Sequence, residues 1–196
     1  MPGNERKDRF VANRAYIVVD LQNEYLPTGN LPLVGIAEAV ATAARVIEAA
    51  RASGEPVIYM RHEGAADSPI FTPGTENVEI IPAVQPRDQE HVIVKHFPNS
   101  FRETGLQALL EEQGITDLVI IGAMSHICID ATARAAGDLG YAVTVVADAC
   151  ATRDLEFEGR TVPAADVHAA FMAALAFAYA KVVAAKDLPA RVPLLA

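Results

Sequence analysis

Short apolar runs alternate along the chain with longer segments of helical periodicity. Five runs have the length and the Val and Ile content of buried strands, and they cover residues 15–19, 56–60, 91–94, 118–121 and 143–147. A shorter sixth run lies near Val182. Helical spacing of apolar residues appears in residues 36–52, 106–113, about 127–139 and 167–179. The pattern predicts strands and helices in regular alternation.

This alternation predicts a three-layer α/β/α fold, because parallel strands need crossover connections and helices usually supply them. We expect a doubly wound parallel sheet of about six strands, in a single domain that covers residues 1–196. Residues 62–90 are irregular and too long for a simple connector, which is typical of a loop that covers a site. In such sheets ligands bind beyond the carboxyl ends of the strands.

The composition narrows the classes of function. Hydrophobic residues make up 52% of the 196 residues, which suits a core that is stable without disulfides or a structural metal. The formal net charge is −9 and no basic patch stands out, so we expect no nucleic-acid partner. Residues 1–10 lack an apolar run and no segment approaches a membrane span in length. We therefore expect a cytoplasmic protein without a membrane partner.

Three chemically active side chains, Asp20, Lys95 and Cys128, each end or follow one of the apolar runs. The carboxyl ends of parallel strands meet at one edge of a sheet, so the three side chains are expected to lie close together. We place Cys128 in the first turn of a helix, where unpaired N–H groups and the helix dipole favour the thiolate. A carboxylate can take the proton of the thiol, and an ammonium stabilises the resulting charge.

Each of these residues also has an ordinary structural explanation. A cysteine in an apolar stretch is often a small buried hydrophobe, Asp20 can shape the turn after its strand, and Lys95 can be a solvated strand end. Two functional alternatives stay open. Cys128 and Cys150 are too few for a disulfide framework, but they leave room for a thiol redox or sensor protein. A non-catalytic scaffold that kept the fold is the other alternative.

Three blocks of sequence carry a resemblance to a known family. They read IVVDLQNEYL around Asp20, VIVKHFPNSF around Lys95, and IIGAMSHICIDATARAAGDLGYAVTVVADACAT around Cys128. With these blocks the chain resembles the isochorismatase-like cysteine hydrolases over nearly its whole length, and in particular their amidohydrolase branch. The resemblance implies a Cys–Asp–Lys triad that hydrolyses an amide or related C–N bond of a small molecule through a thioester.

The resemblance implies further features of the site. A non-proline cis peptide bond would join Ala123 and Met124, and the N–H groups of Met124 and Cys128 would face the developing oxyanion. If the third strand is outermost, as in the family, about 10 Å separate it from the first, and Lys95 has to reach inward. Whether it reaches Cys128 stays open at this point.

Departures from relatives bear on cofactor and substrate. Nicotinamidases of the family hold a metal with an Asp-x-His pair and a further His, but the corresponding stretch here is Tyr59-Met60-Arg61-His62. We therefore expect no metal and no other cofactor. Isochorismatases proper, which cleave a vinyl ether, tend to lack the cysteine, so that activity is the alternative to amide hydrolysis. Substrate contacts are expected from polar residues beside the triad: Asn23, His62, Asn99 and His126.

Residues 169–179 are apolar nearly all round, so both faces of this helix are expected to be covered. A monomer would leave one face exposed. Together with residues 153–162, which are polar and read as a loop, this helix predicts a homo-oligomer, either a dimer or a tetramer. The region would then border the pocket of a neighbouring subunit.

Overall fold

The computed structural model describes residues 13–189, and a six-stranded parallel sheet forms its centre. The strand order is β3-β2-β1-β4-β5-β8. The strands are β1 (Arg14–Val19), β2 (Val57–His62), β3 (His91–Lys95), β4 (Asp117–Ala123), β5 (Ala142–Ala151) and β8 (Lys181–Val183). All pairings within this sheet are parallel. The α/β fold predicted from the alternating pattern is confirmed.

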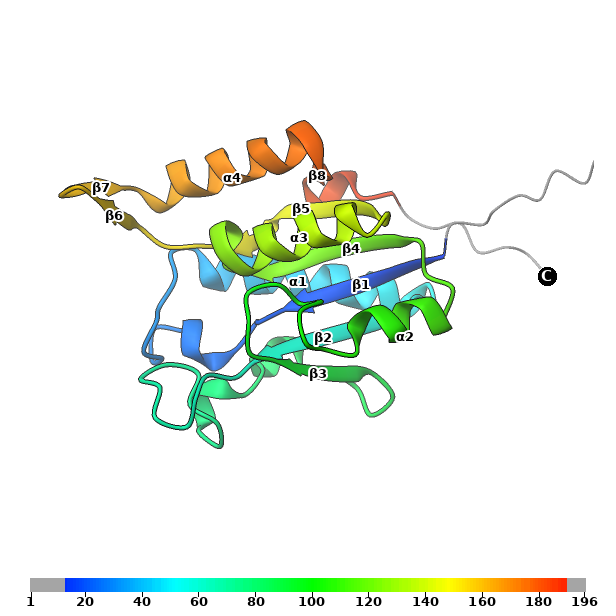
Figure 1. Cartoon of the computed structure of the whole chain (residues 1–196), viewed down its shortest axis with the longest axis horizontal. Coiled ribbons are helices and arrows are strands. Elements are labelled where there is room, and N and C mark those ends of the chain that lie inside the picture. Colours follow the sequence, from blue (N-terminus) through cyan, green and yellow to red (C-terminus); the bar gives the residue numbers. More distant parts are fainter. Residues whose placement is uncertain (1–12, 190–196) are drawn as a thin grey trace, which may run out of the picture.

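Helices cover both faces of the sheet (Figure 1). One face packs against α1 (Ile36–Ala52), and the other packs against α2 (Leu106–Glu112), α3 (Asp130–Asp138) and α4 (Ala164–Ala178). The two cores follow the alternation of side chains along the strands: Tyr16 and Val18 of β1 face α1, whereas Ala15, Ile17 and Val19 face the other helices. Central strands are therefore apolar on both sides, which explains their continuous hydrophobic runs.

The long segment after β2 lies at the carboxyl end of the sheet (Figure 1). Within residues 63–90 the helical structure is limited to two short 3-10 helices, η2 (Glu76–Val78) and η3 (Pro82–Val84). Phe71, Val78 and Val84 are buried in the α1 core. The segment is thus a packed cover over one end of the sheet, in agreement with its expected role as a loop over a site.

The end of β5 and the structure of residues 153–162 differ from the sequence-based predictions. β5 does not end near residue 147 but continues to Ala151, because a bulge in its pairing with β4 lets the strand resume at Cys150 opposite Gly122. The segment 153–162 is not a loop: β6 (Leu155–Phe157) and β7 (Arg160–Val162) form an antiparallel hairpin. Each strand has only three residues, too few to show a periodic pattern, and none of them is buried.

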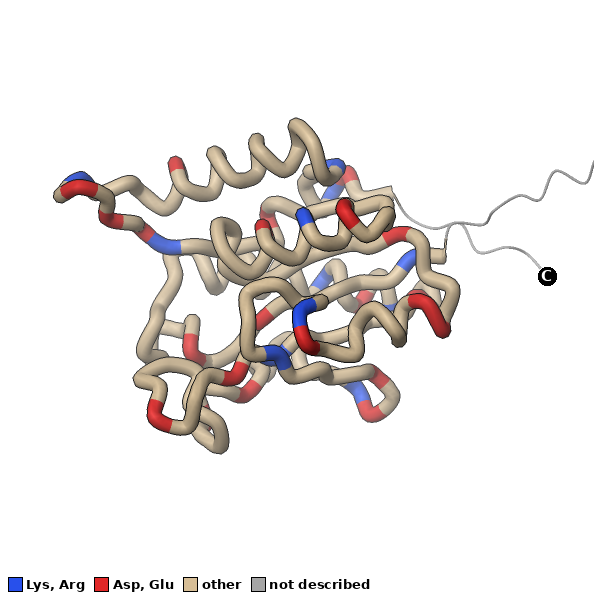
Figure 2. Tube along the Cα trace, viewed as in Figure 1, with Lys and Arg blue, Asp and Glu red and all other residues tan. Residues whose placement is uncertain are grey.

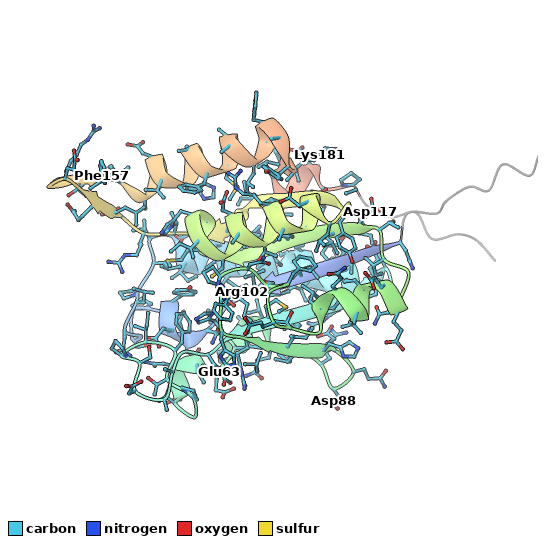
Figure 3. The ribbon with its side chains drawn as sticks, in the orientation of Figure 1. Glu63, Asp88, Arg102, Asp117, Phe157 and Lys181 are labelled. Atoms are coloured by element: carbon cyan, nitrogen blue, oxygen red, sulfur yellow. The ribbon has the colours of Figure 1, made fainter. Side chains whose placement is uncertain are left out.

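The hairpin extends beyond the body of the molecule, beside the start of α4 (Figure 1). Phe157 at its tip is 70% exposed and points away from the core (Figure 3). Phe177 of α4 is 91% exposed, and Asp166 is the one Asp, Glu, Lys or Arg of that helix (Figure 2). No helix within the described part of the chain is long and apolar enough to cross a membrane.

We propose that a second copy of the chain covers this surface, as the apolar helix predicts. A two-stranded hairpin is at best marginally stable in water, so its extension with an exposed Phe157 favours such a partner. Light scattering at micromolar concentration should give at least a dimer mass. The double variant Phe157→Ser/Phe177→Ser should shift the mass toward the monomer, and Val92→Ser on the exposed side of β3 is the control. A monomeric wild type would contradict the proposal.

Candidate active site

Asp20, Lys95 and Cys128 converge at the carboxyl end of the sheet. Asp20 follows β1, Lys95 ends β3, and Cys128 lies in the turn after β4. Asp20 and Lys95 have 0% exposure and Cys128 has 5%. The backbone of Asp20 is left-handed, with φ of 52°, a conformation that Asp tolerates better than most residues do. The three groups that the sequence placed at strand ends therefore lie together, out of contact with bulk water.

Lys95 reaches the centre of the sheet from its edge. β3 is two strands from β1, so roughly 10 Å separate the two backbones. The side chain crosses the end of β2, where Nζ lies 3.2 Å from His62 Nδ1, and Nζ lies 2.8 Å from Asp20 Oδ2. Nζ also donates to Phe97 O at 3.1 Å and to Cys128 Sγ at 3.5 Å. The ammonium thus contacts both the carboxylate and the thiol.

The Asp20 carboxylate stabilises the charged form of Lys95. Burial alone would lower the pKa of Lys95, but the Asp20 carboxylate, and next the Cys128 sulfur, raise it above its ordinary value. Lys95 is therefore an ammonium at neutral pH. The carboxylate oxygens of Asp20 are fully buried, and their close charged neighbour is Lys95 Nζ. A buried ion pair of this kind holds its geometry because either charge alone would be strongly disfavoured.

The protonation of Cys128 differs from the sequence-based prediction. Burial, and next the Asp20 carboxylate, raise the pKa of the thiol well above its usual range, although Lys95 acts in the opposite direction. Cys128 is the fourth residue of η4 (Ser125–Ile129), a π-helical turn, and loss of hydration there outweighs any favourable field at a helix start. The sequence indicated that a helix start would favour the thiolate, whereas burial favours the thiol here. The neutral thiol is therefore the favoured form, and the Asp20 carboxylate lies beside it.

The turn that carries Cys128 is fixed on several sides. Gly122 has φ of 130°, and a Cβ there would lie 1.9 Å from Val19 O, so only glycine fits. The Ala123–Met124 peptide bond is cis, as the family resemblance implied. Ser125 Oγ lies 2.8 Å from His168 Nδ1 of α4, which joins the turn to that helix.

His62 lies between Lys95 and the solvent side of the site. Since an ammonium only donates, Nδ1 of His62 accepts the hydrogen bond from Lys95. Burial is the main cause that lowers the pKa of His62, so the ring is neutral at neutral pH and carries its proton on Nε2. Gln22 holds the backbone of His62: its Oε1 accepts from His62 N–H and its Nε2 donates to His62 O, each at 2.8 Å.

A cavity of about 210 Å³ opens beside Cys128. Aromatic and aliphatic side chains make up most of its wall, among them Tyr25, Leu31, His62, Ile70, Phe71 and Ile127. A larger cavity of about 380 Å³ lies around Arg14 and Glu55, at the opposite end of the strands, and touches none of the three converging groups. The smaller cavity is the candidate substrate site, because it alone of the two reaches the sulfur.

The substrate contacts predicted from the sequence fall into two groups. His62 lines the cavity. Asn23 donates to Glu76 O at 3.0 Å, Asn99 Oδ1 accepts from Phe101 N–H at 2.9 Å, and His126 Nδ1 lies 2.6 Å from Thr152 Oγ1. These last three side chains hold loops and do not line the cavity, so their contact with substrate stays a prediction.

The residues of the site that were missed in the sequence include Gln22, Glu24 and Phe71. Gln22 and Glu24 are polar residues directly after a buried strand, and that position was a usable signal. Phe71 lies in the irregular segment, where no periodicity marks a buried residue. Between residues 13 and 189 no group of three or more His, Cys, Asp or Glu side chains is placed to hold a metal ion.

Comparison with known proteins agrees with this geometry. The family profile of the isochorismatase domain matches residues 14–187. This chain belongs to the isochorismatase-like hydrolase family. A family member from Bacillus subtilis, the uncharacterized protein YddQ, is 48% identical over 86% of the chain and 94% of its own length. The crystal structure of a family protein from Oleispira antarctica is 49% identical, with a TM-score of 0.88, over 91% of this chain and 96% of the other.

Several members of the isochorismatase-like family are named for hydrolysis of amides. N-carbamoylsarcosine amidase from Thermoplasma acidophilum is 28% identical, with a TM-score of 0.76, over 90% of this chain and 98% of the other. Ureidoacrylate amidohydrolase RutB from Acinetobacter baylyi is 30% identical over 69% of this chain and 69% of its own length. The isochorismatase-like family therefore includes amidohydrolases among its hydrolases.

The buried pair of Lys95 and Asp20 can be tested through stability. We expect Lys95→Met to lower the free energy of unfolding by about 3–5 kcal/mol, because the Asp20 carboxylate would stay buried without its cation. The double variant Asp20→Asn/Lys95→Met should regain most of this loss, as measured by urea denaturation. Losses that simply add in the double variant would show that the two charges are not coupled.

Partly buried histidines predict a dependence of stability on pH. Burial lowers the pKa of His62, His126 and His168, so the unfolded chain takes up protons first as the pH falls below about 6.5. The free energy of unfolding should then fall on acidification. His168→Gln should flatten this fall by up to about 1.4 kcal/mol per pH unit in urea denaturation between about pH 7 and 5.5. His91→Gln, at an exposed position, is the matched control and should leave the slope unchanged.

Proposed function

We propose that the chain is a cysteine-dependent amidohydrolase that acts on small molecules in the cytoplasm. The observation that carries the proposal is the contact of one buried ammonium with both a carboxylate and a thiol: Lys95 Nζ lies 2.8 Å from Asp20 Oδ2 and 3.5 Å from Cys128 Sγ. The cavity that could hold an acyl group opens on the same sulfur. Amide-acting relatives in the family support the same chemistry.

In the first half of the reaction, Asp20 takes the proton of the Cys128 thiol while the sulfur attacks the carbonyl carbon of the amide. The S–C bond forms and the carbonyl π bond becomes an oxyanion. The N–H groups of Met124 and Cys128 are the proposed donors to this oxyanion. When the C–N bond breaks, the protonated Asp20 gives its proton to the leaving nitrogen, and a thioester remains on Cys128.

In the second half, a water molecule attacks the thioester and Asp20 takes one of its protons. The C–S bond breaks, the thiol of Cys128 is restored with that proton, and the acid leaves. Lys95 keeps its charge throughout and stabilises the carboxylate whenever Asp20 is ionised. Because the thiol is neutral at rest, proton transfer to Asp20 has to accompany the attack, which makes the carboxylate as important as the sulfur.

The chain contains a matched control for the cysteine. Cys150 is buried like Cys128, but it lies on β5 opposite Gly122 and does not line the cavity beside Cys128. Ammonia release from a panel of small primary amides should be lost by at least about 100-fold in Cys128→Ala and Asp20→Asn. Cys150→Ala should keep wild-type turnover.

Intact-protein mass spectrometry after mixing with substrate should show an acyl adduct on the wild type and none on Cys128→Ala. Equal turnover in Cys128→Ala and the wild type would contradict the proposal. Absence of ammonia and adduct with every amide, in a folded protein, would favour the vinyl-ether, redox or scaffold alternatives.

A further inference from the structure

The cavity beside Cys128 has an uncharged wall. Among the described residues that line it, none is Asp, Glu, Lys or Arg. The ion pair of Asp20 and Lys95 lies next to the sulfur, but the two charges face each other at 2.8 Å and are not part of the lining. Among the lining residues, His62 can titrate near neutral pH. Its ring is partly buried, which lowers its pKa, so it is neutral at pH 7. A ligand in this cavity therefore meets no net charge.

We propose that the substrate is a small amide with an uncharged acyl group, and that Phe71 determines which acyl groups fit. An ionised substituent would lose its hydration on entering the cavity without gaining a counter-ion, and that loss is large for any buried unpaired charge. The same argument applies to carboxylates and to ammonium groups. The inference rests on the proposed function, since it names the substrate class of the same site.

The volume limits the size of the acyl group. The cavity measures about 210 Å³, below the roughly 300–1,000 Å³ of pockets that enclose drug-sized ligands. A single ring or a short branched chain fills such a space.

Phe71 forms a rigid part of the wall. Its N–H donates to Glu24 Oε2 at 2.8 Å, and its carbonyl accepts from Gly64 N–H at 2.9 Å. Its ring lies edge-to-face with Tyr25 and with His62, at centroid distances of 5.3 Å and 5.0 Å. Glu24 itself has 0% exposure, and it also accepts from Asn30 N–H at 2.8 Å.

The left-handed backbone at Phe71, with φ of 53°, is unusual for an aromatic residue and is held by these bonds. Phe71 is held at its backbone and on two sides of its ring. This part of the wall therefore selects ligands by their shape and does not adjust to them. Phe71 is therefore the specificity-determining residue, although no periodicity in the sequence marks it.

The experiment uses two amides of the same shape and different charge. The nitro group of 4-nitrobenzamide matches the carboxylate of 4-carbamoylbenzoate in shape but carries no net charge, and benzamide is the smaller reference. Binding to Cys128→Ala, measured by calorimetry, should favour 4-nitrobenzamide over 4-carbamoylbenzoate by at least about 100-fold. Phe71→Ala should strengthen binding of the larger 4-nitrobenzamide relative to benzamide. Phe71→Leu should change this ratio less.

The possible outcomes separate the two proposals. Preference for the neutral amide in Cys128→Ala, with no turnover in the wild type, would keep the selection of uncharged ligands by the cavity and contradict the proposed cysteine chemistry. Equal or tighter binding of the carboxylate would overturn the inference whether or not amides are hydrolysed. Absence of binding by benzamide and both of its derivatives would also overturn it, and so would an unchanged size preference in Phe71→Ala.

Discussion

The site depends on one ion pair that water does not reach. Lys95 and Asp20 both have 0% exposure, and the ammonium and carboxylate lie 2.8 Å apart. Separating two such charges in the interior would leave each without hydration or a counter-ion, so the pair fixes where the ends of β1 and β3 lie relative to each other. Cys128 then sits beside a carboxylate that cannot move away, which is the arrangement that a neutral thiol needs in order to lose its proton.

The topology of the sheet brings Asp20 and Lys95 to one edge, but it also places a strand between them. Parallel strands bring their carboxyl ends to one edge, but the order β3-β2-β1 places β2 between the two charged residues. Only a long side chain can cross that strand, and Lys95 does so past His62. An arginine at position 95 would bring a planar guanidinium group, which binds a carboxylate through two parallel hydrogen bonds. That geometry would not fit here, because a single nitrogen atom, Lys95 Nζ, contacts Asp20, Phe97 O and Cys128.

The sequence predicted the frame and the three converging residues, because buried strands and strand ends leave a local signature. Apolar runs showed β1 and β4 well, and Asp20, Lys95 and Cys128 followed from their places at the ends of such runs. The hairpin β6–β7 was missed because its strands bury neither face. The raised pKa of Cys128 could not be predicted, because a helix start is visible in a sequence, whereas the burial that outweighs it depends on contacts between distant segments.

Phe71 was missed because its burial also depends on contacts between distant segments. Its position shows that the three converging residues and the cavity wall come from different parts of the fold. The reacting groups sit at strand ends, which the core of the sheet holds rigidly. Part of the wall of the cavity comes from residues 63–90, a segment outside the sheet that is held through Glu24 and Gln22. Asp20 and Lys95 neutralise each other at the strand ends, so in the proposed function the wall selects the acyl group by its shape. If the proposed function holds, changes in this segment alter the selected acyl group without disturbing the ion pair of Asp20 and Lys95.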